Sequence, residues 1–177
     1  QAFDDAPAKL GILHAHGAIV AFLDDDTVPA DGWLQQAVSY FSDPTIAAVG
    51  GPATTPDSDP DMAKMGGGVL ANPLVSGPAR CRYVPTIVHD VDDHPSCNLL
   101  VRTDILKAIG GFRVDYWPGE DTYLCMEITG KIGRRIVYDP RVLVSHHRRA
   151  LFLPHLRQIG RYARHRGYFA RYHPQTS

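Results

Sequence analysis

The sequence has few cysteines and no long apolar run, and each absence excludes a class of protein. The 177 residues include three cysteines and no CxxC pair, so neither a zinc ribbon nor a disulfide framework is predicted. Reduced, buried thiols are expected instead. No stretch of about 18 apolar residues occurs, so no segment is predicted to span a bilayer. Hydrophobic residues make up 44% and charged residues 21%, which is typical of one globular domain.

Acidic residues are missing from the C-terminal end. Residues 1–139 hold all 19 acids against 10 Lys and Arg, a net charge of −9, whereas residues 140–177 hold 8 Arg, a net charge of +8. Such asymmetry favours an anionic partner for the end of the chain, such as lipid headgroups. No aromatic RNA-binding motif or zinc-finger pattern occurs, so nucleic acid is not expected. We therefore divide the chain into residues 1–150 and a basic amphipathic helix or tail over residues 151–177.

Short apolar runs alternate with helical periodicity, which predicts an α/β fold. Residues 18–23 form an apolar run that fits a strand buried on both faces. Residues 53–95 are rich in proline and are predicted to form long loops around one helix near Met62. The other predicted strands are 46–50, 97–101, 135–138 and 142–144, and the other predicted helices are 31–41, 103–109, 120–129 and the segment from 151 onward.

Three consecutive aspartates follow the first predicted strand. Residues i and i+2 share a face of an extended chain, so Asp24 and Asp26 should converge while Asp25 points away. Carboxylates repel one another, and a site that keeps them together usually holds a divalent cation. Such a cation would bridge to the phosphates of a substrate. The alternative is a solvated acidic turn.

Two acids, Glu120 and Asp121, are predicted to open a helix. Asp121 shares its helical face with Leu124, Cys125 and Ile128, which places it on the inward stripe. The helix dipole favours the anion and burial disfavours it, and this balance suits a general base. The alternative is an ordinary acid in a first helical turn.

A pair of histidines, His146 and His147, follows the last predicted strand and precedes two arginines. A neutral imidazole can complete a carboxylate metal site, and arginines bind phosphate. The alternative is a structural or surface pair. Histidine clusters at 14–16 and 89–94 also have a metal-like composition, the first predicted on a helix surface and the second in a proline-bounded loop.

These segments, in this order, resemble the family 2 glycosyltransferases. A lone DDD is a weak signal, but the ordered set is specific and covers roughly residues 9–175. The resemblance implies a GT-A fold, which is a mixed sheet flanked by helices, and a nucleotide-sugar donor. The matching stretches are 17–26, Pro29 with Trp33 and Leu34, 49–52, 97–102, 110–112, 119–121 and 144–146.

The resemblance also implies roles for individual residues. Asp24, Asp26 and His146 would bind Mn²⁺ or Mg²⁺, and Asp121 would be the base that deprotonates the acceptor hydroxyl, beside Glu120. The reaction would be a single displacement with inversion at the anomeric carbon. A sugar or lipid-linked acceptor and a cytoplasmic location at the inner face of the membrane are implied as well. The donor would contact Asp24, Asp25, Asp26, Asn98 and Arg102.

Family members usually begin with strands that hold the base and ribose of the donor. Only eight residues precede Lys9 here, so the resemblance implies a GT-A domain that lacks its first strands. Two alternatives remain open. The aspartates also fit the first motif of haloacid-dehalogenase-type phosphohydrolases, with Asp24 as nucleophile. The basic end also fits a non-catalytic module that binds anionic surfaces.

Overall fold

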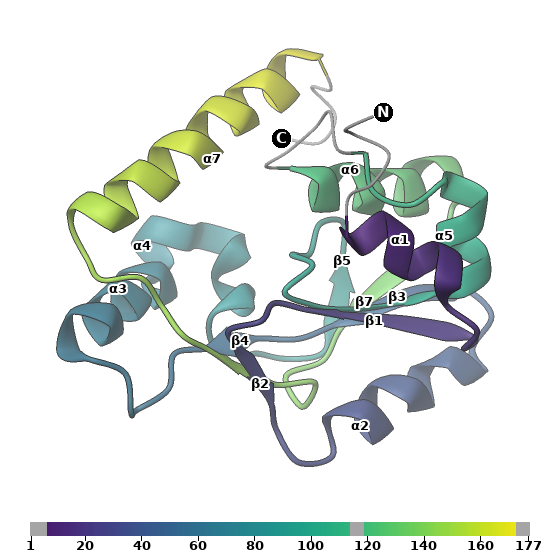
Figure 1. Ribbon diagram of the computed structural model, residues 1–177, viewed down its shortest axis with the longest axis horizontal. Coiled ribbons are helices and arrows are strands. Elements are labelled where there is room, and N and C mark those ends of the chain that lie inside the picture. Colours follow the sequence, from purple (N-terminus) through teal and green to yellow (C-terminus); the bar gives the residue numbers. More distant parts are fainter. Residues whose placement is uncertain (1–6, 114–118, 173–177) are drawn as a thin grey trace.

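The computed structural model in Figure 1 describes residues 7–113 and 119–172. Its centre is a five-stranded mixed sheet in which only the β3–β7 pair is parallel. A second sheet of three short strands continues from it. This α/β architecture confirms the predicted fold class. The order in the first sheet is β1 (Ile19–Leu23), β6 (Asn98–Arg102), β3 (Ile46–Gly50), β7 (Arg135–Tyr138) and β5 (His89–Val91), and in the second β2 (Thr27–Pro29), β8 (Val144–His146) and β4 (Ala53–Thr54).

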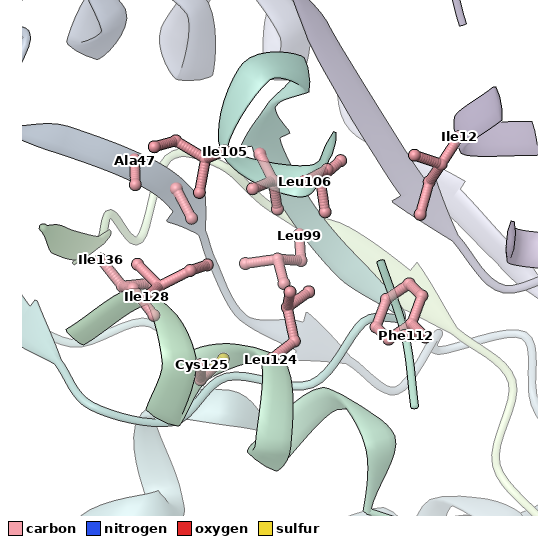
Figure 2. Packing of buried hydrophobic residues seen from close by; sticks show 12 residues of the cluster. Ile12, Ala47, Leu99, Ile105, Leu106, Phe112, Leu124, Cys125, Ile128 and Ile136 are labelled. Carbon is pink, nitrogen blue, oxygen red and sulfur yellow. The ribbon is translucent and has the colours of Figure 1, made fainter. Parts of the chain in front are cut away.

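Helices cover both faces of the central sheet (Figure 1). One face packs against α1 (Pro7–His14), α5 (Thr103–Ile109) and α6 (Glu120–Met126), and α6 continues into a π-helical turn, Glu127–Lys131. The buried side chains of this layer, including Leu99, Leu106 and Leu124, interlock in Figure 2. The other face packs against α2 (Trp33–Ser39), which a 3₁₀ turn, Tyr40–Ser42, extends. Burial on both faces explains the continuous apolar runs of the central strands.

The remaining helices lie beyond the second sheet. They are α3 (Asp61–Ala71), α4 (Pro73–Ser76), a 3₁₀ helix (Gly77–Arg82) and the long C-terminal α7 (Leu153–Tyr172). The segment that leads into α7 runs along α3, where the Leu151 N–H donates to the Met62 carbonyl at 3.0 Å. In the described part of the chain, no helix has both the length and the apolar character needed to cross a membrane.

The structure corrects three local predictions. The strand at 18–23 is not buried on both faces: β1 lies at an edge of the described sheet, and Ala21 and Leu23 are exposed. The region 53–95 is not mainly loop, because α4, the 3₁₀ helix and two short strands accompany α3. The last strand begins at Val144 rather than Val142, since the Val142 N–H bonds back to the Asp139 carbonyl in a turn.

Candidate active site

The three aspartates form the tight turn between β1 and β2. The amide and hydroxyl of Thr27 donate to the Asp24 carbonyl at 3.1 and 2.7 Å, which closes the turn. β2 pairs with β8 so that Thr27 lies opposite His146. The turn just before Thr27 therefore places the aspartate carboxylates next to the His146 ring. His146 Nε2 lies 3.0 Å from Asp26 Oδ1 and 3.9 Å from Asp24 Oδ2. The structure therefore brings together the three residues expected to converge, Asp24, Asp26 and His146.

Several negative charges close together in this cluster are electrostatically unfavourable. Burial, followed by the charges of Asp26 and Asp25, raises the pKa of Asp24. Burial and the nearby Arg148 guanidinium lower the pKa of His146, although Asp26 opposes them. The imidazole is therefore mainly neutral at pH 7, and its charge does not compensate the aspartates. A cation would relieve the repulsion between the carboxylates.

Arg148 fixes the proton on the His146 ring. Its Nη1 lies 3.2 Å from His146 Nδ1, and because a guanidinium can only donate, Nδ1 must accept. The proton of the neutral ring is then on Nε2, from which it is donated to Asp26. The guanidinium also stacks over Tyr83, 5.3 Å from the ring centre, and donates to the Ala53 carbonyl. Its Nε has no partner within the described residues.

A third segment brings a thiol to the cluster. Cys97 directly precedes β6, and the antiparallel register that pairs Leu23 with Asn98 places Cys97 beside Asp24. A carboxylate oxygen of Asp24, the thiol of Cys97 and a ring nitrogen of His146 all lie within 4.8 Å of one another. Burial and the negative charge of Asp24 raise the pKa of Cys97 to about 12, so the thiol is neutral. From the sequence, Cys97 was expected only to be a buried, reduced thiol.

Asp121 lies in the first turn of α6, as expected. Its Oδ1 accepts from the Thr122 N–H at 2.8 Å. Burial, followed by the charges of Asp93 and Glu120, raises the pKa of Asp121 to about 6. Its negative charge also contributes to the raised pKa of Cys97, as do those of Asp24 and Asp26, so both acidic groups act on the same thiol.

Two neighbours of Asp121 were not identified from the sequence. Arg82 Nη2 forms an ion pair with Asp93 Oδ2 at 2.8 Å, and both residues influence the pKa of Asp121. Glu120 Oε2 instead accepts from the Gly119 N–H at 2.8 Å. Asp93 belongs to the 89–94 cluster, in which His94 is fully buried with Nε2 3.1 Å from the Gly51 carbonyl oxygen. That cluster therefore adds a carboxylate near Asp121.

Asn98 and Arg102 make structural contacts and do not join the cluster. The buried Asn98 amide accepts from Trp33 Nε1 at 2.8 Å and donates to the Val142 carbonyl at 2.7 Å. Arg102 pairs with Ile19, at the opposite end of β1 from the aspartates. Its guanidinium donates to three backbone carbonyls, of Phe41, Asp43 and Ile46, at 2.7 to 2.9 Å. A donor contact through either side chain would have to break these hydrogen bonds.

The donor atoms of the cluster fit a divalent cation. Carboxylate oxygens suit Mg²⁺ and Mn²⁺, and a neutral imidazole suits several transition metals. Among the described residues, Asp24, Cys97 and His146 are the one group of three potential ligands that converge to within 4.8 Å. Side-chain exposures of 50% for Asp24 and Asp26 leave both carboxylates accessible from solvent. The residues present therefore fit a bound metal ion.

The fold is shared with a solved glycosyltransferase. The mannosyltransferase PcManGT from Pyrobaculum calidifontis, in complex with GDP-Man and Mn2+, aligns with a TM-score of 0.57 and 19% identity. The match covers 93% of this chain and 42% of that one. Together with the mixed sheet flanked by helices, this likeness confirms the GT-A fold.

Sequence comparisons agree with the fold. The pre-mycofactocin glycosyltransferases of Mycobacterium tuberculosis strains CDC 1551 / Oshkosh and ATCC 25618 / H37Rv are each 30% identical over 146 residues. The chain spans only 30% of the length of these relatives, and the match covers 81% of the chain. The family model described as "Glycosyltransferase like family 2" matches residues 8–165. The chain thus belongs to glycosyltransferase family 2.

Proposed function

We propose that the protein transfers a sugar from a nucleotide-sugar donor to an acceptor hydroxyl, with inversion at the anomeric carbon. The observation that carries this proposal is the convergence of Asp24 and Asp26, after β1, with His146 of β8, near a thiol whose pKa Asp121 also raises. One acidic group would serve the leaving diphosphate and the other the attacking hydroxyl. Such a division of labour is what a single displacement requires. Membership of glycosyltransferase family 2 argues against the phosphohydrolase alternative.

Asp121 is proposed as the general base. A base must be ionised at the working pH and still accept a proton readily, and a pKa of about 6 meets both conditions near neutrality. Burial is the largest cause of this shift, and the nearby Asp93 and Glu120 carboxylates add to it. A carboxylate with the usual pKa, near 4, would be a weaker proton acceptor. Glu120 is proposed to help by raising the pKa of Asp121 through its own negative charge. It is not proposed to take up the proton itself.

A divalent cation held by Asp24, Asp26 and His146 would neutralise the charge that develops on the departing diphosphate. PcManGT was solved with GDP-Man and Mn2+, which supports a sugar nucleotide and a divalent cation for this chain as well. Arg148, next to His146, would add positive charge on the same side. Arginine is a common ligand of phosphate oxygens.

The C-terminal helix is proposed to hold the domain against an anionic membrane surface. Leu153 and Leu156 of α7 are each 61% exposed, and Arg157 and Arg164 beside them are exposed too. A helix with an apolar stripe next to a cationic stripe is typical of a membrane-surface element. A lipid-linked acceptor would suit a protein placed in this way.

The reaction can be tested directly on the full-length protein. Release of nucleoside diphosphate from a panel of nucleotide sugars should require Mn²⁺ or Mg²⁺ and stop when a chelator is added. Nuclear magnetic resonance of the glycoside product should show the anomeric configuration opposite to that of the donor. Retention of configuration would exclude the single displacement. Undiminished turnover in chelator would exclude the metal.

A further inference from the structure

We infer that Cys97 supplies a sulfur ligand to the proposed metal site, so that Asp24, Cys97 and His146 together bind a thiophilic cation such as Zn²⁺, Co²⁺ or Cd²⁺. The inference rests on the proposed metal site and adds a ligand and a metal preference to it. A site made only of aspartates and a histidine would bind Mn²⁺ or Mg²⁺. A sulfur ligand changes which ion the site holds most tightly.

The geometry requires little rearrangement. The three ligand atoms come from three segments, the end of β1, the residue before β6 and the end of β8, and all lie within 4.8 Å of one another. In a tetrahedral zinc site with bonds of about 2.0–2.3 Å, ligand atoms are about 3–4 Å apart. Each side chain therefore has to move by about 1 Å or less. Asp24, whose side chain is half exposed, has room to turn.

The surroundings of the sulfur favour a ligand role over a purely structural one. Cys97 is 9% exposed, and no hydrogen bond to its thiol is found in the part of the chain that the structure describes. Around it lie the carboxylates of Asp24, Asp26 and Asp121. As the metal–sulfur bond forms, the thiol proton passes to solvent.

Metal binding would also displace Arg148. Nε2 of His146 faces the aspartates and carries the ring proton, because Nδ1 accepts from Arg148. When Nε2 binds a cation, the proton of the neutral ring must move to Nδ1, where the guanidinium now donates. Arg148 then has to leave the ring. Its guanidinium would keep the Ala53 carbonyl and the Tyr83 ring as partners.

Cobalt spectroscopy tests the sulfur ligand without any activity measurement. The full-length protein is titrated with Co²⁺, and a thiolate-to-cobalt charge-transfer band is expected in the near ultraviolet. The band should disappear in Cys97→Ser and Cys97→Ala and persist in Cys81→Ser, a matched control because Cys81 is also buried and free. Competition should show that Cys97→Ser weakens Zn²⁺ binding by about 10–100-fold relative to Mn²⁺.

Mn²⁺ binding, followed by electron paramagnetic resonance, separates this inference from the proposed function. If Mn²⁺ binds the wild type but Co²⁺ gives no charge-transfer band, the sulfur ligand is wrong and the proposed metal site stands. An equal band in Cys97→Ser also overturns the inference. If neither ion binds, the proposed metal site fails together with it. Retained Mn²⁺ binding by Cys97→Ser shows that the variant is folded around the site.

Discussion

The acidic cluster and helix α7 carry opposite charges in opposite structural settings. Asp121 is far in sequence from Asp24 and Asp26, and all three carboxylates raise the pKa of one buried thiol, that of Cys97. Three arginines of α7, Arg157, Arg164 and Arg171, are instead exposed along one helix without any acid nearby in sequence. Convergence and burial shift the pKa of a carboxylate, whereas a row of solvated charges only creates a field. The convergent carboxylates are suited to catalysis, and the arginines of α7 are suited to attracting an anionic surface.

The largest expected effect is on the proposed base. Asp121→Asn keeps the size and most of the hydrogen bonding of the side chain but cannot accept the hydroxyl proton. We expect kcat to fall by about 10²- to 10⁴-fold, with nearly unchanged donor affinity. In the wild type, kcat/KM should rise with pH through about 6 and then level off, as Asp121 ionises. Single-turnover assays and donor titration measure both quantities, and near-normal turnover by the variant would eliminate Asp121 as base.

The same substitution should stabilise the fold. Because the pKa of Asp121 is raised from 3.8 to about 6, the folded state binds a proton that the unfolded state has released between these values. Stability from this group therefore falls as pH rises through that window. At about 1.4 kcal/mol per pKa unit, Asp121→Asn should gain at most about 3 kcal/mol at pH 8.

Urea unfolding at two pH values measures this gain. The difference between variant and wild type should nearly vanish at pH 3.5, where the carboxyl is protonated in both states. Asp104→Asn, at an acid in the first turn of α5, is a matched control that should show no comparable gain. A variant that is destabilised at pH 8 would show that the Asp121 charge is better solvated than its burial indicates.

Asp26 should matter for the metal rather than for the proton. Replacing it with Asn removes the negative charge of one carboxylate but keeps an oxygen that can accept the His146 hydrogen bond. We expect Mn²⁺ affinity to fall by about 100-fold, and high Mn²⁺ to restore much of the activity. Asp25→Asn removes the same charge from the exposed middle residue and should cost far less. Equal losses in the two variants would mean that the turn acts only through its total charge.

The sequence predicted the parts of the site that one segment defines. The i, i+2 spacing of Asp24 and Asp26 and the position of Asp121 in a first helical turn are local features, and the structure has both. Cys97 was missed as a site residue because its approach to Asp24 depends on β1 pairing with β6, which local periodicity does not reveal. The same pairing places Arg102 at the far end of the strands, away from the cluster.

The helix itself was predictable, but its packing was not. Apolar residues at helical spacing from Leu151 onward predicted α7, and its stripe could have faced either the protein core or solvent. The structure leaves Leu153, Leu156 and Ile159 at 40–61% exposure. Exposed apolar area of this kind mostly marks an interaction surface. Tertiary contacts decide whether the apolar stripe of α7 faces the protein core or solvent. The amphipathic sequence pattern is the same for both arrangements.

The smallest expected effect concerns that helix. Each arginine near an anionic leaflet contributes about 1 kcal/mol, so replacing Arg157 and Arg164 with Gln should weaken binding to anionic vesicles by about 30-fold. Co-sedimentation with vesicles of phosphatidylserine and phosphatidylcholine measures this loss, which added salt should reproduce in the wild type. The double variant Lys107→Gln and Arg134→Gln removes the same charge elsewhere and should bind nearly as the wild type does. Turnover of a water-soluble acceptor should be unaffected by the α7 substitutions, because these residues lie outside the acidic cluster. Equal binding to neutral vesicles, or equal losses in both double variants, would mean that α7 does not recognise anionic lipid.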